Sequence, residues 1–151
     1  MTDADTTTTT TPQFTITRTL DASRERIFTA WTDPDEATQW WGPRGVRTPR
    51  ETMTLEPWVG GAWCWTMVSD TDGTEYPCIG VVLEIEPPER LSFTWGNPGE
   101  ESPPVVTLTL RDLGGSTELT LHVAGIAGEP GDDNVYDGWS EDIDMLVEHL
   151  A

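Results

Sequence analysis

The C-terminal stretch GWSEDIDMLVEHL, residues 138–150, decides the predicted fold, because it reads as the one long amphipathic helix of the chain. Apolar residues at helical spacing form a stripe on one face, namely Trp139, Ile143, Leu146 and Leu150. The opposite face carries Glu141, Asp144 and Glu148, and we expect Asp137 to cap the first turn. A single curved sheet needs an element that covers its apolar face. We therefore predict an α+β fold in which this helix packs across a sheet.

The chain before this helix reads mainly as strands, which turn residues separate at regular intervals. We expect six or seven antiparallel strands, over residues 13–20, 47–55, 63–68, 76–86, 90–95, 105–110 and 117–123. Two short helices follow the first strand; Asp21 or Ser23 caps one of them, and Pro34 begins the other. Residues 1–12 form a threonine-rich tail that we expect to be disordered. Residues 13–151 are then expected to form a single domain.

The composition argues against two classes of partner. The chain has 27 acidic and 8 basic side chains, and its net charge of −19 repels phosphate backbones and anionic lipid surfaces. We therefore expect neither nucleic acid nor a membrane as partner and, without a secretory pattern at the N-terminus, a cytoplasmic location. All basic residues are Arg, which either genomic base composition or adaptation to a salty cytoplasm explains. Cys64 and Cys78 are expected to be free thiols.

Short sequence motifs, taken in their order and spacing, resemble one known family. They are Ile16-Thr-Arg18, Ala22-Ser23, Ile27-Phe28-Thr-Ala-Trp31-Thr32-Asp33-Pro34, Trp40-Trp41-Gly42-Pro43, Gly60-Gly61-Ala-Trp63 with Met67, Asp72-Gly73, Gly80-Val-Val82-Leu-Glu84-Ile85, Pro87-Pro88-Glu89-Arg90-Leu91, Thr117-Glu-Leu119-Thr-Leu121-His122 and Gly138-Trp139. From about residue 14 to 150, the chain resembles the activator of Hsp90 ATPase homologue 1-like domain of the START/Bet v 1-like superfamily. The resemblance implies a helix-grip fold, in which a curved antiparallel sheet surrounds the C-terminal helix. It also implies an elongated cavity, which holds an apolar ligand in many relatives, but no shared catalytic set.

Aromatic and aliphatic residues that alternate along the strands are the candidates for a ligand pocket. Each alternating set projects to one face of its strand, where it forms either an ordinary core or the wall of a cavity. We also expect the glycine-rich loop 125–131 and Gly138 to let the pocket entrance open. The candidate pocket residues are Trp31, Trp41, Trp63, Trp65, Met67, Val82, Glu84, Leu91, Phe93, Trp95, Leu108, Leu119, Leu121, Trp139, Ile143 and Leu146.

The facing of the central strand 76–86 has two interpretations. A three-residue hairpin loop at 71–73 pairs Trp65 with Ile79 and turns Ile79, Val81 and Leu83 inward. The family pattern instead favours Gly80, Val82 and Glu84 on the cavity side, with Arg18 as a partner for the Glu84 carboxylate. One residue more or less in the loop, or a bulge in the strand, exchanges the residues that face inward with those that face outward.

Motifs for metal, phosphate or nucleophilic chemistry are absent from the sequence. It has no HExxH, CxxC, phosphate-binding loop or Gly-x-Ser-x-Gly motif, so we expect no cofactor and no metal, and enzymatic activity is not the favoured hypothesis. The favoured function is the binding of a small apolar or amphipathic molecule between sheet and helix. Two alternatives remain: an enzyme of the cyclase or hydratase kind that uses the same cavity, and a stress-related module that acts on an Hsp90-type chaperone.

Overall fold

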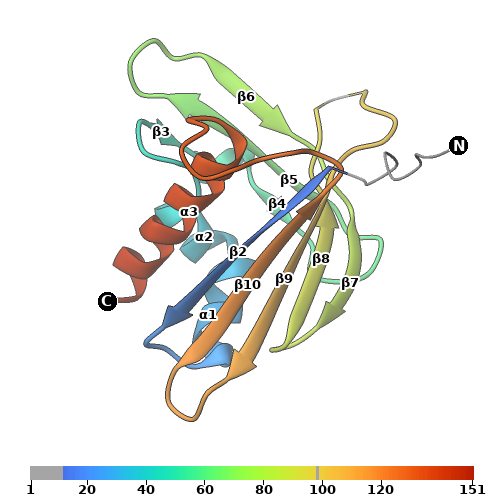
Figure 1. The fold of residues 1–151 in the computed structure, drawn as a ribbon. Helices are drawn as coiled ribbons and strands as arrows, with labels where there is room; N and C mark the ends of the chain where they lie inside the picture. The colour runs from blue at the N-terminus through green and yellow to red at the C-terminus, as the bar shows by residue number, and fades with distance from the viewer. Residues whose placement is uncertain (1–11, 98) are drawn as a thin grey trace, which may run out of the picture.

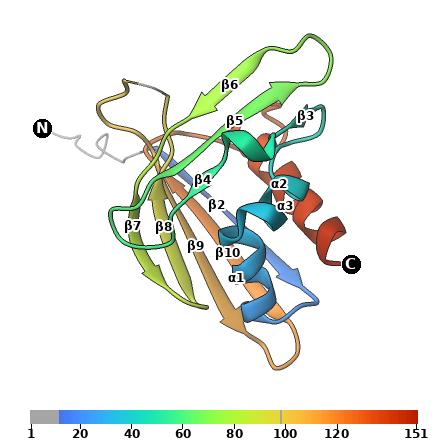
Figure 2. The same ribbon diagram turned by 180° about the vertical axis from the view of Figure 1, so that it is seen from behind.

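The α-helices of the described residues cover the same face of a curved antiparallel sheet, as two opposite views of the molecule show (Figures 1 and 2). The computed structural model describes residues 12–97 and 99–151, so nearly all of the predicted tail, residues 1–11, lies outside the described residues. The α+β class and the order of elements match the prediction from sequence. No helix in the described part of the chain is long and apolar enough to cross a membrane.

The larger sheet has five strands in the order β2-β10-β9-β8-β7. Their bounds are β2 Gln13–Leu20, β10 Thr117–Ala124, β9 Val105–Asp112, β8 Arg90–Thr94 and β7 Val82–Glu86. Apolar and polar residues alternate along these strands, so that Leu121 pairs with Ile16 on one side and Leu108 on the other. All three of these side chains are buried, which places the core on the helix-covered face.

The smaller sheet is built around β5 (Trp63–Ser69). It has the order β3-β5-β4, and β6 (Glu75–Cys78) also pairs with β5. The predicted strand 47–55 is interrupted: β3 (Val46–Arg47) and β4 (Thr54–Leu55) are short and flank the 3₁₀ helix η1 (Arg50–Thr52). The backbone N–H of Ser69 donates to the carbonyl of Thr74 at 2.8 Å, and this pair closes the β5–β6 hairpin. The hairpin loop therefore has four residues, 70–73. The prediction of a three-residue loop was therefore wrong by one residue.

The predicted strand 76–86 is divided between the two sheets, and Gly80 lies at the division. Its carbonyl accepts the N–H of Trp63 at 2.9 Å, while the next carbonyl, of Val81, accepts the N–H of Thr94 at 3.0 Å. A Cβ atom at position 80 would lie 1.9 Å from the Thr94 carbonyl oxygen. Only glycine permits this close approach, which joins the two sheets into one continuous curved surface.

The corrected hairpin register decides which side of the central strand faces the core. Trp65 pairs with Cys78, not with Ile79, and Gly80 and Val82 are buried as the family pattern implies. Ile79, Val81 and Leu83 are exposed, so the first interpretation was wrong. The register then shifts between Val82 and Glu84, which turns Glu84 outward as well.

The helices begin at the residues that satisfy their first backbone N–H groups. In α1 (Arg24–Thr32) the Ser23 side chain accepts the N–H of Arg26, and in α2 (Pro34–Trp40) the Asp33 side chain caps the first turn. The long helix α3 covers Val135–Leu150 and starts three residues before the predicted position. Asp137 therefore lies in the first turn of the helix and is not its cap.

Candidate functional site

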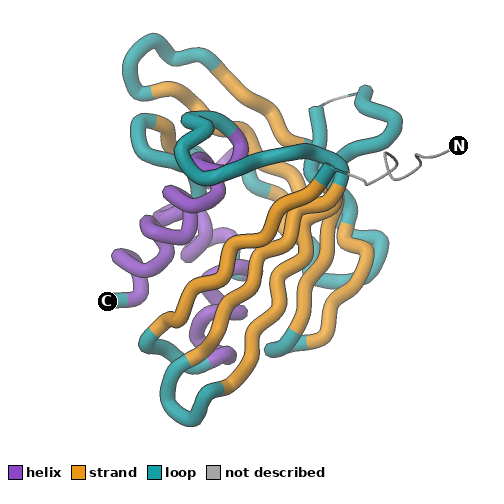
Figure 3. Tube along the Cα trace, in the orientation of Figure 1, coloured by secondary structure: helices purple, strands orange, loops and turns teal. Residues whose placement is uncertain are grey.

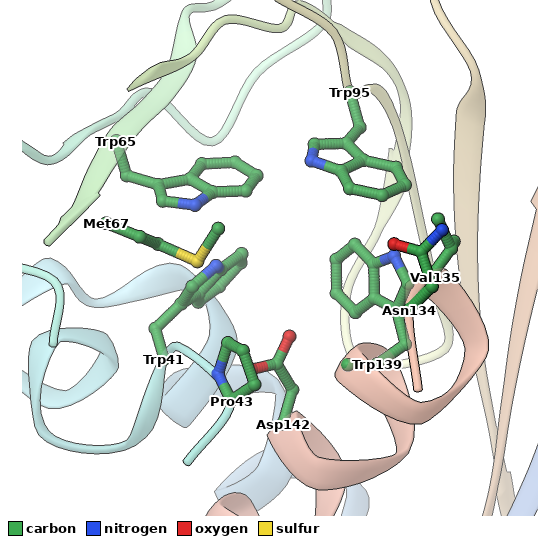
Figure 4. A pocket seen from close by; sticks show the side chains of 10 residues that line it. Trp41, Pro43, Trp65, Met67, Trp95, Asn134, Val135, Trp139 and Asp142 are labelled. Carbon is green, nitrogen blue, oxygen red and sulfur yellow. The ribbon is translucent and has the colours of Figure 1, made fainter. Parts of the chain in front are cut away.

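A pocket of about 180 Å³ lies between the N-terminal half of α3, strand β5 and the segments that follow α2 and β8 (Figure 4). Most of its wall is apolar. The lining residues are Trp41, Pro43, Trp65, Met67, Trp95, Asn134, Val135, Gly138, Trp139 and Asp142. The helix therefore covers the concave face of the sheet without filling all of the space beneath it.

Four indoles form two pairs on opposite sides of this space. Trp41, the residue that follows α2, packs on Trp65 of β5 with ring centroids 4.9 Å apart. Trp95, just after β8, makes an edge-to-face contact with Trp139 of α3 at 5.2 Å. Figure 4 shows the first pair facing the second across the pocket. Because indoles are rigid and each packs on its own partner, the space between the pairs is preformed.

Asp142 is the single ionisable side chain among the ten lining residues. Its carboxylate accepts the backbone N–H of Gly42 at 2.9 Å and so connects α3 to the turn after α2. The side chain is 6% exposed and points toward the space between the indoles (Figure 4). Burial raises the pKa of the Asp142 carboxyl well above its usual value; the Gly42 hydrogen bond opposes this, and the charge of Glu141 adds to it.

A second pocket of about 390 Å³ adjoins the first and shares Met67, Trp95 and Asn134 with it. Its other walls come from β6 and from the segments around Gly96 and Ile126. Burial raises the pKa of the Cys78 thiol, which lines this pocket, to about 11, so the group is protonated at neutral pH. Neither Cys78 nor Cys64 forms a disulfide. The two pockets are therefore neighbouring parts of one larger hollow.

The loop 125–134 enters both pockets through Asn134 and leads from β10 to α3 (Figure 3). The Asp132 carboxylate accepts backbone N–H groups of Glu129, Asn134, Tyr136 and Asp137, at 2.9–3.2 Å. Asp137 in turn accepts the N–H groups of Gly131 and Asp133. Desolvation acts to raise the pKa of Asp132, but these N–H donors outweigh it and lower the pKa. Asp132 rather than Asp137 therefore satisfies the start of α3, and residues 129–134 of the loop are tied together by hydrogen bonds.

Five of the sixteen candidate pocket residues line the pocket: Trp41, Trp65, Met67, Trp95 and Trp139. Ten others are at most 1% exposed and pack in the hydrophobic core, away from the lining: Trp31, Trp63, Val82, Leu91, Phe93, Leu108, Leu119, Leu121, Ile143 and Leu146. Alternation along a strand identifies the inward face, but it does not distinguish the filled part of the concavity from the open part.

Glu84 was placed in the pocket by sequence, and this was wrong. Its side chain is half exposed and forms an ion pair with Arg90 at 2.8 Å. Arg18, the partner expected for Glu84, instead forms an ion pair with Asp144 on α3 at 2.6 Å. The register shift after Val82 is the physical reason, since it reverses the alternation along β7.

Asp142 lines the pocket but was missed by sequence reasoning, although the sequence contains a signal for it. It follows Trp139 by three positions and precedes Leu146 by four, and therefore lies on the apolar stripe of α3. An acid on the buried stripe of a helix needs a partner or a function.

Histidine, cysteine and acidic residues of the described part of the chain do not gather into a metal site. Residues 12–97 and 99–151 contain no group of three or more such side chains arranged to hold a metal ion. His122 contacts Thr15 at 2.8 Å, and His149 contacts Glu36 at 2.9 Å, both away from the pocket. The chemistry that the pocket offers is therefore mainly apolar contact, together with the Asp142 carboxyl group, the Asn134 amide and the indole N–H groups of Trp65 and Trp139, which have no hydrogen-bond partner within the described residues.

Comparisons with known proteins agree on one family. The matching family model is described as activator of Hsp90 ATPase homolog 1-like protein and covers residues 21–151. A crystal structure of a Chromobacterium violaceum protein is 26% identical, covers 90% of this chain and 94% of its own, and has a TM-score of 0.79. The AHSA1 protein of Silicibacter pomeroyi is also 26% identical, with coverage of 91% and 96% and a TM-score of 0.75. No curated protein matches the chain.

Proposed function

The chain belongs to the activator of Hsp90 ATPase homolog 1-like family, and we propose that it binds a small apolar or amphipathic molecule in the pocket between α3 and β5. The observation that carries this proposal is the preformed space of about 180 Å³ between two pairs of indoles. A cavity of roughly 150 Å³ lined by apolar side chains suffices to bind benzene. A ligand of one or two rings therefore matches the first pocket.

The energetics favour a ligand that is mostly apolar. Apolar surface removed from water contributes about 25 cal/mol per Å², and most of the lining consists of indole and aliphatic surface. The adjoining pocket shares three lining residues with the first and gives room for a tail or substituent. Asp142 and Asn134 supply the few polar atoms that orient a ligand in such a site.

The experiment uses naphthalene as probe and the indole N–H resonances of the tryptophans as readout. We expect naphthalene to shift the resonances of Trp41, Trp65, Trp95 and Trp139, which line the pocket, and to leave those of Trp31 and Trp63 in place. Shifts confined to Trp58, which is exposed and does not line the pocket, would contradict the proposal.

A blocking variant makes the test specific for this pocket. Gly138 lines the pocket in the first turns of α3, and an added Cβ there meets no atom within 4 Å. We expect Gly138→Phe to fill part of the space and abolish the naphthalene shifts, while Gly138→Ala, which adds one methyl group, retains them. Retention of full binding in Gly138→Phe would show that the probe binds elsewhere.

One observation favours a second candidate function, an enzyme that uses the same cavity. The pocket contains a buried carboxyl group with a raised pKa, a property that general acids and bases share. We expect such an enzyme to exchange the α-hydrogens of bound 2-tetralone for deuterium, and Asp142→Asn to abolish the exchange without loss of binding. An exchange rate equal to that in buffer would argue against catalysis of this proton transfer.

The chaperone-module alternative predicts an exposed apolar patch and no internal cavity. Trp58 and Val59 are indeed exposed. A chaperone module does not require a pocket, however, whereas a ligand-binding protein does. The presence of the pocket therefore favours ligand binding.

A further inference from the structure

Among the residues that the structure describes, no basic side chain pairs with the carboxyl group of Asp142. Within the described residues its hydrogen-bond partner is the neutral N–H of Gly42, and none of the ten residues that line the pocket is basic. The arginines do not supply the missing charge, because all eight pair with other carboxylates: Arg18 with Asp144, Arg24 with Glu89, Arg26 with Glu36, Arg44 with Glu148, Arg47 with Asp70, Arg50 with Asp35, Arg90 with Glu84 and Arg111 with Glu118.

The surroundings of this carboxyl group are the second part of the argument. Four indoles flank the space toward which Asp142 points (Figure 4). Indole is the side chain that attracts a cation most strongly through its ring face, and the attraction increases when the cation is desolvated. A quaternary or methylated ammonium group has the apolar surface that such walls require and the charge that the carboxylate requires.

We propose that the ligand of this pocket carries an organic cation, a methylated ammonium group that sits between the two indole pairs with Asp142 as its counter-ion. The inference rests on the proposed function and names the chemical class of the ligand. The net charge of −19 supports it, because the protein's field attracts cations to its surface and repels anions. Burial raises the pKa of Asp142 because it disfavours the charged carboxylate, and a bound cation would offset this cost.

A matched pair of ligands separates charge from shape. Choline carries a trimethylammonium group, and 3,3-dimethylbutan-1-ol is its neutral counterpart with a tert-butyl group. We expect NMR titration of the indole N–H resonances to show that choline binds at least about tenfold more tightly than the neutral alcohol. This corresponds to a difference in binding free energy of about 1.4 kcal/mol. Equal affinity, or tighter binding of the neutral alcohol, would overturn the proposal.

Two variants of α3 test the role assigned to Asp142. Asp142→Asn keeps an oxygen for the Gly42 N–H but removes the charge, and we expect choline affinity to fall to that of the neutral alcohol. Asp144→Asn removes the same charge from the exposed side of the helix and should change choline affinity less than twofold. An equal loss in both variants would show that only the overall charge matters. If Asp142→Asn fails to fold, the choline-to-alcohol ratio of the unmodified protein still decides.

Failure of this inference is distinguishable from failure of the proposed function. If naphthalene or the neutral alcohol shifts the four lining indoles and choline does not, the pocket binds neutral molecules and the cation proposal is wrong. If none of the three probes shifts them, both proposals fail.

Discussion

The two halves of α3 face the same curved sheet but differ in how they contact it. The C-terminal half contributes Ile143 and Leu146, which have no exposed surface, to the core shared with Leu108 and Leu121. The N-terminal half carries Trp139 and Asp142 and borders an open space of about 180 Å³. One helix therefore closes the core at one end and forms the wall of a pocket at the other.

The contrast between the two halves shows that the type of side chain determines where space remains between the helix and the sheet. Branched aliphatic side chains interdigitate to the density of a crystal and leave few voids. The indoles at the other end are large and rigid, and each packs against a second indole, Trp41 on Trp65 and Trp95 on Trp139. The space of about 180 Å³ lies between these two pairs. The following four predictions test this contrast.

The largest effect is expected in the packed half. Leu146→Ala should lower the free energy of unfolding by about 2–5 kcal/mol, because it leaves a cavity where Leu146 is fully buried. Urea unfolding measures this loss. Val147→Ala, on the exposed side of the same turn, should cost no more than about 0.5 kcal/mol. A similar, small loss in both variants would show that this half of the interface is not close-packed.

The second effect concerns the buried acid of the pocket half. Burial raises the pKa of Asp142 in the folded state, so the folded protein holds this proton more tightly than the unfolded chain does. The protonated Asp142 side chain therefore contributes its full stabilisation below the pKa that it has in the unfolded chain. This stabilisation is lost as the pH rises through the pKa that Asp142 has in the folded protein. Asp142→Asn should therefore be more stable than the unmodified protein at pH 8, by about 1–3 kcal/mol.

Thermal unfolding of both proteins at several pH values measures this difference. It should shrink as the pH falls toward 4, because the unmodified carboxyl group then regains its proton. A difference that does not change with pH would contradict the raised pKa.

The third effect compares two methionines. Met67 lines both pockets, whereas Met53 is buried in the core. Met53→Ala should cost about 2–5 kcal/mol, but Met67→Ala only roughly 1–2 kcal/mol, because one side of Met67 already faces open space. Chemical unfolding of the two variants measures both losses. Equal losses would mean that the pocket closes around Met67 in solution.

The smallest effect concerns the loop before α3. Asp132→Ala removes the carboxylate that accepts N–H groups at the start of the helix and should lower the stability of the protein only slightly. Hydrogen exchange of amides 129–137 should become faster, whereas Glu129→Ala, at an exposed position of the same loop, should leave it unchanged. Fast exchange of these amides in the unmodified protein would instead support the opening of the loop 125–131 that its glycines suggest.

The sequence predicted the architecture well because architecture depends on patterns that extend over many residues. Alternation over 117–123 and the helical stripe from Trp139 to Leu150 each contain several consistent positions, so single exceptions do not change the conclusion. Both features occur in the structure close to the expected positions. The family model and the structural neighbours support the same fold.

The site was harder to predict because it depends on single residues. One additional residue in the hairpin loop changed the partner of Trp65, and one register shift turned Glu84 outward. Asp142 was overlooked because an acid among other acids on a helix attracts no notice until its position on the apolar stripe is checked. The separation of packed from open space depends on three-dimensional shape, which alternation does not encode.

Gly80 has a consequence that reaches beyond the joint between the sheets. It holds the backbones of Trp63 and Thr94 together, and these belong to the two strands that carry the opposing pocket walls, Trp65 in β5 and Trp95 just after β8. Any larger residue at position 80 would force these strands apart. A substitution at position 80 would therefore change the separation of the two pocket walls without replacing any residue that lines the pocket.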